Sequence, residues 1–260
     1  MAQISLKWWP VGQGLFMTGR LRGASGGVFD WVYDCGSLSG QEERDNAIKS
    51  YRDSLPRKHI DLVTLSHFDL DHINGIVALL KGFSVGMLLL PYAPLWKRLL
   101  IAMDEGITSA DPLFEFYLNP VSYFARETGG GLRQVVFVPE ANADDVVPPS
   151  DGPLDWEQPL DGFEAEYGDA PTESIGDTVI DDFGGMQVRF LKPAGRIFIP
   201  NLWEFIPYND PKKTSSIRKP FEKWVTHIAR IFTINDSLRA KGLKILKKGY
   251  PRWFGSEKKG

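Results

Sequence analysis

The chain has 260 residues, 43% of them hydrophobic and 12% aromatic, which is enough to bury a full core in one large or two small domains and excludes a disordered chain. No apolar stretch approaches the roughly 20 residues that span a bilayer, and the N-terminus lacks a signal-peptide pattern, so we expect a protein without membrane contact. The net charge of −3 identifies no partner, and the single cysteine excludes an internal disulfide and favours the reducing cytoplasm.

Residues 1–138 carry most of the predicted regular structure. Alternating apolar residues around turn-forming glycines predict an antiparallel meander of three strands, ISLKWWPV, GLFMTGRL and VFDWVYD. Ser39 is expected to cap a polar helix over residues 40–54, which ends before Pro56. The β-branched run HIDLVTLS then predicts a buried strand that leads directly to His67.

Helical and strand patterns alternate after this point. Apolar residues at helical spacing predict a helix over residues 73–80, which Gly82 ends. VGMLLL and RQVVFVP predict further buried strands, with helices over residues 93–105 and 111–127 between them. Alternation of this kind, after antiparallel hairpins, indicates a layered α/β domain.

The rest of the chain divides into two regions. Residues 139–178 are rich in Pro, Gly, Asp and Glu without steady periodicity, which predicts an acidic loop or insertion. In residues 179–260 we expect a hairpin of DTVIDDF and MQVRFLKP, a strand LWEFIPY and an amphipathic helix from Ser216. A basic tail follows over residues 239–259. It is typical of a solvated terminus, and a nucleic-acid contact is the alternative.

A cluster of four metal-ligand residue types follows the strand before His67. His67, Asp69, Asp71 and His72 stand within six positions, although the whole chain has only four histidines. Alternate residues of a tight turn can converge on one point, and imidazole and carboxylate are the ligands of a divalent ion that activates water. Capping aspartates beside incidental histidines are the structural alternative. The density of ligands favours a metal site.

These residues resemble the HxHxDH signature of the metallo-β-lactamase fold, with Asp69 in place of the usual second His. The HxDxDH variant is similar to the domain at the end of bacterial competence DNA-uptake proteins and to its free-standing relatives. Further matching pieces stand in the same order: VGQG at residues 11–14, DCGS at residues 34–37, and Asn74-Gly75. The resemblance is specific over residues 4–80 and diffuse after that.

The resemblance implies an αββα sandwich that binds one or two metal ions, usually zinc, and hydrolyses its substrate with metal-activated water. His67 and Asp69 would ligate the first ion, Asp71 and His72 the second, and Asp71 would also orient the attacking water. Asp34 would hydrogen-bond beneath the site. Because Asp69 supplies a hard oxygen donor, manganese or magnesium is the alternative to zinc. The expected substrate is a phosphodiester such as nucleic acid, and no substrate-binding residue is identified.

The later ligand segments of the family, a TGD-like and an HHGS-like segment, have no match. Asp169 and His227 are weak substitutes, and the more ordinary interpretations are a loop residue and a surface residue. We therefore expect an incomplete C-terminal half of the fold and weak or absent catalysis. A homo- or hetero-oligomer would cover the incomplete sheet. The competing hypothesis is a non-catalytic binding or partner module. Cys35, without a neighbouring base, is expected to be a buried structural residue.

Overall fold

The computed structural model describes residues 1–141, 148, 152, 155–157, 160, 162–170, 185–210, 219–229 and 236–253. The chain forms two compact units. The larger unit comprises Met1–Tyr92, Ala125–Asp169 and Asp182–Pro211, and the smaller comprises Ala93–Phe124, Ala170–Asp181 and Lys212–Gly260. The candidate site lies in the larger unit.

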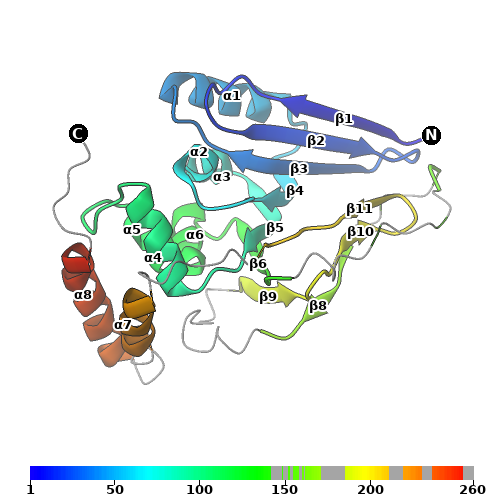
Figure 1. Ribbon diagram of the computed structural model, residues 1–260. Helices are drawn as coiled ribbons and strands as arrows, with labels where there is room; N and C mark the ends of the chain where they lie inside the picture. The colour runs from blue at the N-terminus through cyan, green and yellow to red at the C-terminus, as the bar shows by residue number, and fades with distance from the viewer. Residues whose placement is uncertain are drawn as a thin grey trace. The chain divides into compact units, whose positions relative to one another are not determined.

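A mixed eight-stranded sheet organises the larger unit (Figure 1). Its order is β1-β2-β3-β4-β5-β6-β9-β8. The first three strands and the β8–β9 pair are antiparallel, whereas β3, β4, β5, β6 and β9 run parallel to one another. The strands are β1 (Gln3–Trp8), β2 (Phe16–Arg22), β3 (Val28–Cys35), β4 (His59–Thr64), β5 (Ser84–Pro91), β6 (Leu132–Val138), β8 (Tyr167–Gly168) and β9 (Gln187–Leu191).

A second, three-stranded sheet packs on one face of the large sheet. It consists of β7 (Glu164–Ala165), β10 (Ile197–Ile199) and β11 (Trp203–Phe205), in the order β11-β10-β7. Central strands buried on both faces read as continuous apolar runs, as in VGMLLL of β5. The shared core between the sheets contains Leu21, Phe29, Trp31, Leu62, Met87, Leu89, Val136, Val138, Leu191, Ile197, Ile199 and Leu202.

Helices cover the other face of the large sheet. Helix α1 (Gln41–Ser54) buries Ala47, Ile48 and Tyr51, and the Tyr51 ring packs edge-on against Trp9 and Phe16. Two short helices, α2 (Leu70–Ile73) and α3 (Ile76–Leu80), follow β4. The larger unit is therefore a mixed α/β structure with a helical layer, a large mixed sheet and a small sheet.

Several elements differ from the sequence prediction, each for a local reason. The expected helix over residues 73–80 is two helices that break at Asn74-Gly75, because the Gly75 backbone N–H donates to the Cys35 carbonyl at 2.9 Å instead of continuing the helical ladder. Ser39 does not cap α1. Its hydroxyl accepts a hydrogen bond from the Gln13 backbone at 2.6 Å, and Gly40 is the N-cap.

The acidic region contains structure that its composition did not predict. Strands β7 and β8 lie within residues 139–178, and each has only two residues, too few to give a periodic signal. Of the expected hairpin, MQVRFLKP forms β9, which pairs with β6 and β8, while DTVIDDF lies outside the described residues. LWEFIPY contains β11 as expected, and β10 was not predicted.

The smaller unit contains mainly helices, and chain continuity links it to the larger unit through α6 (Pro120–Thr128). Within it, the buried Arg98 side chain donates hydrogen bonds to the carbonyl groups of Ala93, Tyr117 and Leu118. None of the helices in the described part of the chain is both long and apolar enough to cross a membrane. The other helices of this unit are α4 (Leu95–Asp104), α5 (Phe114–Leu118), α7 (Lys219–Ala229) and α8 (Asp236–Trp253).

Candidate metal centre

The candidate site lies where two parallel strands end. Strands β3 and β4 are hydrogen-bonded neighbours, so their carboxyl ends meet at one edge of the sheet. Asp34 stands at the end of β3, and the loop that follows β4 carries Ser66, His67 and Asp69 into α2. Ligands of open α/β sheets bind at the carboxyl ends of the strands. The strand order therefore places the whole motif where a site is expected.

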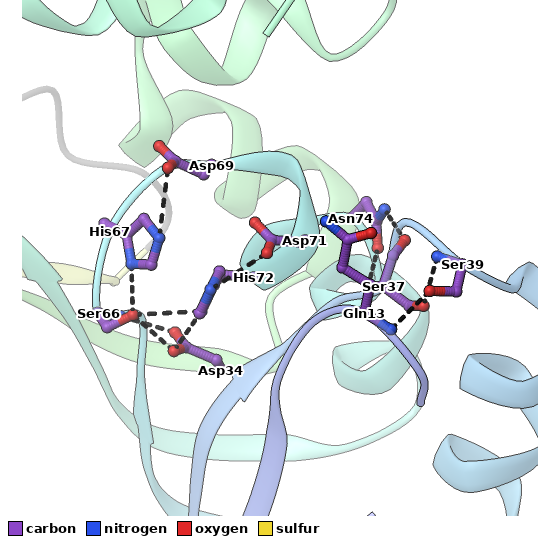
Figure 2. Close-up of polar contacts among 10 residues, drawn as sticks. All are labelled: Gln13, Asp34, Ser37, Ser39, Ser66, His67, Asp69, Asp71, His72 and Asn74. Atoms are coloured by element: carbon purple, nitrogen blue, oxygen red, sulfur yellow. Dashed lines mark hydrogen bonds and ion pairs between the residues drawn. The ribbon is translucent and has the colours of Figure 1, made fainter. Parts of the chain in front are cut away.

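Asp34 is a buried carboxylate that accepts three hydrogen bonds (Figure 2). Its Oδ1 accepts from the Ser66 backbone N–H at 2.7 Å, and its Oδ2 lies 2.6 Å from Ser66 Oγ and 2.8 Å from His72 Nδ1. The backbone of Asp34 is left-handed, with φ of +56°. Asp tolerates this conformation better than most residues. The strand thus turns at Asp34 and directs the carboxylate beneath the loop.

The two histidines of the motif are both held through Nδ1. His67 Nδ1 lies 2.7 Å from Ser66 Oγ, and the His67 and His72 ring centroids are 3.9 Å apart. His67 Nε2 lies 3.5 Å from Asp69 Oδ2, and His72 Nε2 lies 3.6 Å from Asp71 Oδ2 (Figure 2). With Nδ1 engaged in each ring, Nε2 is the nitrogen that remains for a metal ion.

Three of the four motif residues form a group that fits a metal ion. Ligand atoms of His67, Asp71 and His72 all lie within 4.8 Å of one another. Two imidazole nitrogens and one carboxylate oxygen make a donor set that zinc uses in catalytic sites, where a fourth position stays open. Asp69 lies beside His67 but outside this group of three. The expected pairing of His67 with Asp69 and of Asp71 with His72 around separate ions stays a prediction.

Close backbone packing holds the motif loop from below. A Cβ on Gly36 would lie 2.5 Å from the Asp71 carbonyl carbon and oxygen, and one on Gly14 would clash with the Gly36 carbonyl oxygen. Asn74 joins the same frame through Ser37, with Nδ2 donating to the Ser37 carbonyl at 2.7 Å. The segments VGQG, DCGS and Asn74-Gly75, separate in sequence, therefore meet around the loop that carries the ligands.

The remaining candidates do not join this group. Asp169 is exposed directly after β8, and His227 is an exposed residue of α7 in the smaller unit. Cys35 is fully buried, and burial raises the pKa of its thiol far above the usual range, as expected for a structural cysteine. Sequence reasoning missed Ser66. Its signal was a hydroxyl residue directly before His67 at the end of a buried strand.

Comparisons with known proteins give limited information. No family model matches the chain, and no curated protein matches it. Among solved structures, the crystal structure of a long form RNase Z from yeast is similar at 10% sequence identity and a TM-score of 0.25, over 52% of this chain and 17% of that chain. A similarity of this size assigns neither a fold nor an activity.

Proposed function

We propose that the chain is a metal-dependent hydrolase with a metallo-β-lactamase-like fold. The observation that carries the proposal is the group of His67, Asp71 and His72, in which both imidazoles are fixed through Nδ1 and leave Nε2 for a metal ion. When bound there, a divalent ion would lower the pKa of water and polarise the substrate. Zinc is our first choice, and manganese or magnesium is the alternative if Asp69 also binds.

Two acidic residues would have different roles, one in holding a histidine ring and the other in orienting the water molecule. Asp34 is buried and keeps the His72 ring in place through a 2.8 Å contact. The Asp71 carboxylate is about a quarter exposed, so it can contact both the ion and a water molecule. An ionised carboxylate can orient that water and accept its proton, which is the role we assign to Asp71.

The substrate class that we propose is a phosphodiester, because the HxDxDH pattern resembles the DNA-uptake branch of the family. The basic tail supports a nucleic-acid contact only in part. Tyr250 is buried and donates a hydrogen bond to the Leu99 carbonyl at 3.0 Å, so it cannot stack on a base. Lys247 forms an ion pair with Glu115, which reduces the charge available to a polyanion.

One observation favours the second candidate function, a non-catalytic binding module. Within the described residues, the only group of at least three His, Cys, Asp or Glu ligands is the one formed by His67, Asp71 and His72. Three ligands from one short loop can bind an ion, but a carboxylate that bridges two ions is not seen in this group. A module of this kind would bind metal without turnover.

Metal content and hydrolysis together separate these functions. The protein is purified without chelator, its zinc and manganese are measured, and bis-p-nitrophenyl phosphate, single-stranded DNA and nitrocefin are offered as substrates. We expect bound metal that His67→Ala abolishes and weak phosphodiester cleavage that Asp71→Ala abolishes, with exposed His227→Ala as the matched control. Metal without turnover supports the binding module. No metal at any loading rejects the hydrolase and supports a non-catalytic partner module, and cleavage of nitrocefin alone rejects the phosphodiester substrate.

A further inference from the structure

Ser66 connects the buried carboxylate of Asp34 with the His67 ring. His72 Nδ1 contacts Asp34 directly, at 2.8 Å, whereas His67 Nδ1 contacts Ser66 Oγ, at 2.7 Å. The Ser66 hydroxyl in turn lies 2.6 Å from Asp34 Oδ2. One buried carboxylate therefore serves both rings, one by direct contact and the other through a hydroxyl.

Counting protons fixes the direction of each hydrogen bond. An ionised Asp34 can only accept, and the Ser66 hydroxyl has a single proton. At 2.6 Å that proton must point to Asp34 Oδ2, because two oxygen lone pairs would otherwise face each other. Ser66 Oγ is then an acceptor towards His67, and the proton of the neutral His67 ring must be on Nδ1. Nε2 then keeps its lone pair, which is available to a metal ion.

Other contacts of Ser66 agree with this assignment. Its backbone N–H donates to Asp34 Oδ1 at 2.7 Å, so the backbone and the hydroxyl of Ser66 both bond the Asp34 carboxylate. The distance from Ser66 Oγ to His72 Nδ1 is 3.4 Å, much longer than the direct contact of His72 with Asp34.

We propose that Ser66 is a positioning residue that sets the Nδ1–H tautomer of His67 and so presents Nε2 to the metal. The inference rests on the proposed metal-binding function of the group, but the tautomer itself is a property of the metal-free chain. Hydrogen-bond partners of this kind typically change metal affinity by about 10–100-fold when they are removed. The role is specific to His67, because His72 has its own contact with Asp34.

The first experiment measures the tautomers directly. Long-range ¹H–¹⁵N correlation spectra are recorded on the ¹⁵N-labelled full chain with chelator, at a pH where the imidazoles are neutral, and a His67→Gln spectrum assigns the His67 signals. In the wild type we expect Nδ1–H for both His67 and His72. Ser66→Ala should shift His67 to a mixture of tautomers and leave His72 unchanged, and Ser66→Thr, which keeps the hydroxyl, should preserve both. An Nε2–H tautomer of His67 in the wild type would overturn the proposal whether or not any variant folds.

The second experiment measures zinc affinity by competition with a chromophoric chelator. Ser66→Ala should bind zinc about 10–100-fold more weakly and Ser66→Thr within a few-fold of the wild type. Wild-type affinity in Ser66→Ala would overturn the inference while leaving the proposed function in place. The expected tautomers in a chain that binds no zinc would instead reject the proposed function and support the tautomer assignment.

Discussion

At the scale of single residues, the buried carboxylate of Asp34 determines whether the site is preorganised. We predict that Asp34→Asn lowers zinc affinity by about 10–100-fold and the free energy of unfolding by roughly 1–3 kcal/mol. Asn tolerates the left-handed backbone, but its amide replaces one acceptor oxygen with a donor that faces Ser66 or His72. Zinc competition and urea denaturation measure the two effects. Asp53→Asn, which changes an exposed pair with Lys49, is the control. Wild-type affinity in Asp34→Asn would show that the three contacts do not orient the ligands.

Cys35 offers a second test at this scale, since its thiol lies directly after Asp34. Burial raises the pKa of the thiol, so the thiolate that reacts with disulfide reagents is scarce in the folded protein. We expect no reaction with 5,5′-dithiobis-(2-nitrobenzoate) at pH 8 in native buffer and one equivalent in denaturant. Rapid labelling of the native protein would mean that the end of β3 opens readily, which would contradict a rigid frame beneath the metal group.

The sequence predicted which residues form the site, but it did not predict which of them converge on one point. The density of His67, Asp69, Asp71 and His72 was sufficient to locate the centre, because these residues are adjacent in the chain. Which of them converge depends on how the loop turns into α2, and spacing alone does not specify that turn. The contribution of Ser66 depends on Asp34, which is 32 positions earlier, and a contact of this kind becomes visible only when β3 and β4 pair.

At the scale of elements, the ligand loop depends on glycines that let three segments approach closely. We predict that Gly36→Ala displaces the loop, because its Cβ would lie 2.5 Å from the Asp71 carbonyl and 2.6 Å from the His72 backbone nitrogen. Zinc affinity should fall by at least about 10-fold, and the free energy of unfolding by roughly 1–3 kcal/mol. Isothermal titration and thermal denaturation provide the measurements.

A second glycine serves as the matched control for this prediction. Gly26 has φ of +87°, and beyond its chain neighbours no heavy atom lies within 4 Å of the position that a Cβ would take, so Gly26→Ala introduces backbone strain without a clash. It should lower the free energy of unfolding by about 1–2 kcal/mol and leave zinc affinity unchanged. Equal losses of zinc affinity in both variants would indicate a general effect of stability rather than displacement of the loop.

Element types were predictable where the pattern was long and ambiguous where it was short. The meander β1–β3 and the buried strands β4, β5 and β6 follow alternation or apolar runs of at least six residues, and all six form. The break between α2 and α3 was not predictable, because Ile73 and Ile76 keep helical spacing across it. The Gly75 backbone N–H bonds the Cys35 carbonyl and so leaves the helical ladder, and periodicity carries no information about such a long-range bond.

At the scale of the larger unit, the apolar edge of the large sheet has a consequence for association. Strand β1 is one of the two edge strands of this sheet, and all six of its residues are exposed. Ile4, Leu6 and Trp8 alternate along one face with exposed fractions of 40%, 45% and 64%. An edge strand with unpaired backbone groups and an apolar row favours pairing with another chain, and charged residues are the usual protection against it.

We therefore predict that the protein associates in a concentration-dependent way and that Leu6→Lys weakens this association. The substitution places a charge in the centre of the row, while the exposed position limits the change in unfolding free energy to about 0.5 kcal/mol. Sedimentation velocity over a wide range of concentration measures the effect. Ile245→Lys, at a residue of α8 that is 44% exposed, is the control for added charge elsewhere. If the wild type stays monomeric at every concentration, another feature must protect the β1 edge. If both variants behave alike, the oligomer that we expected from the incomplete sheet does not form through this strand.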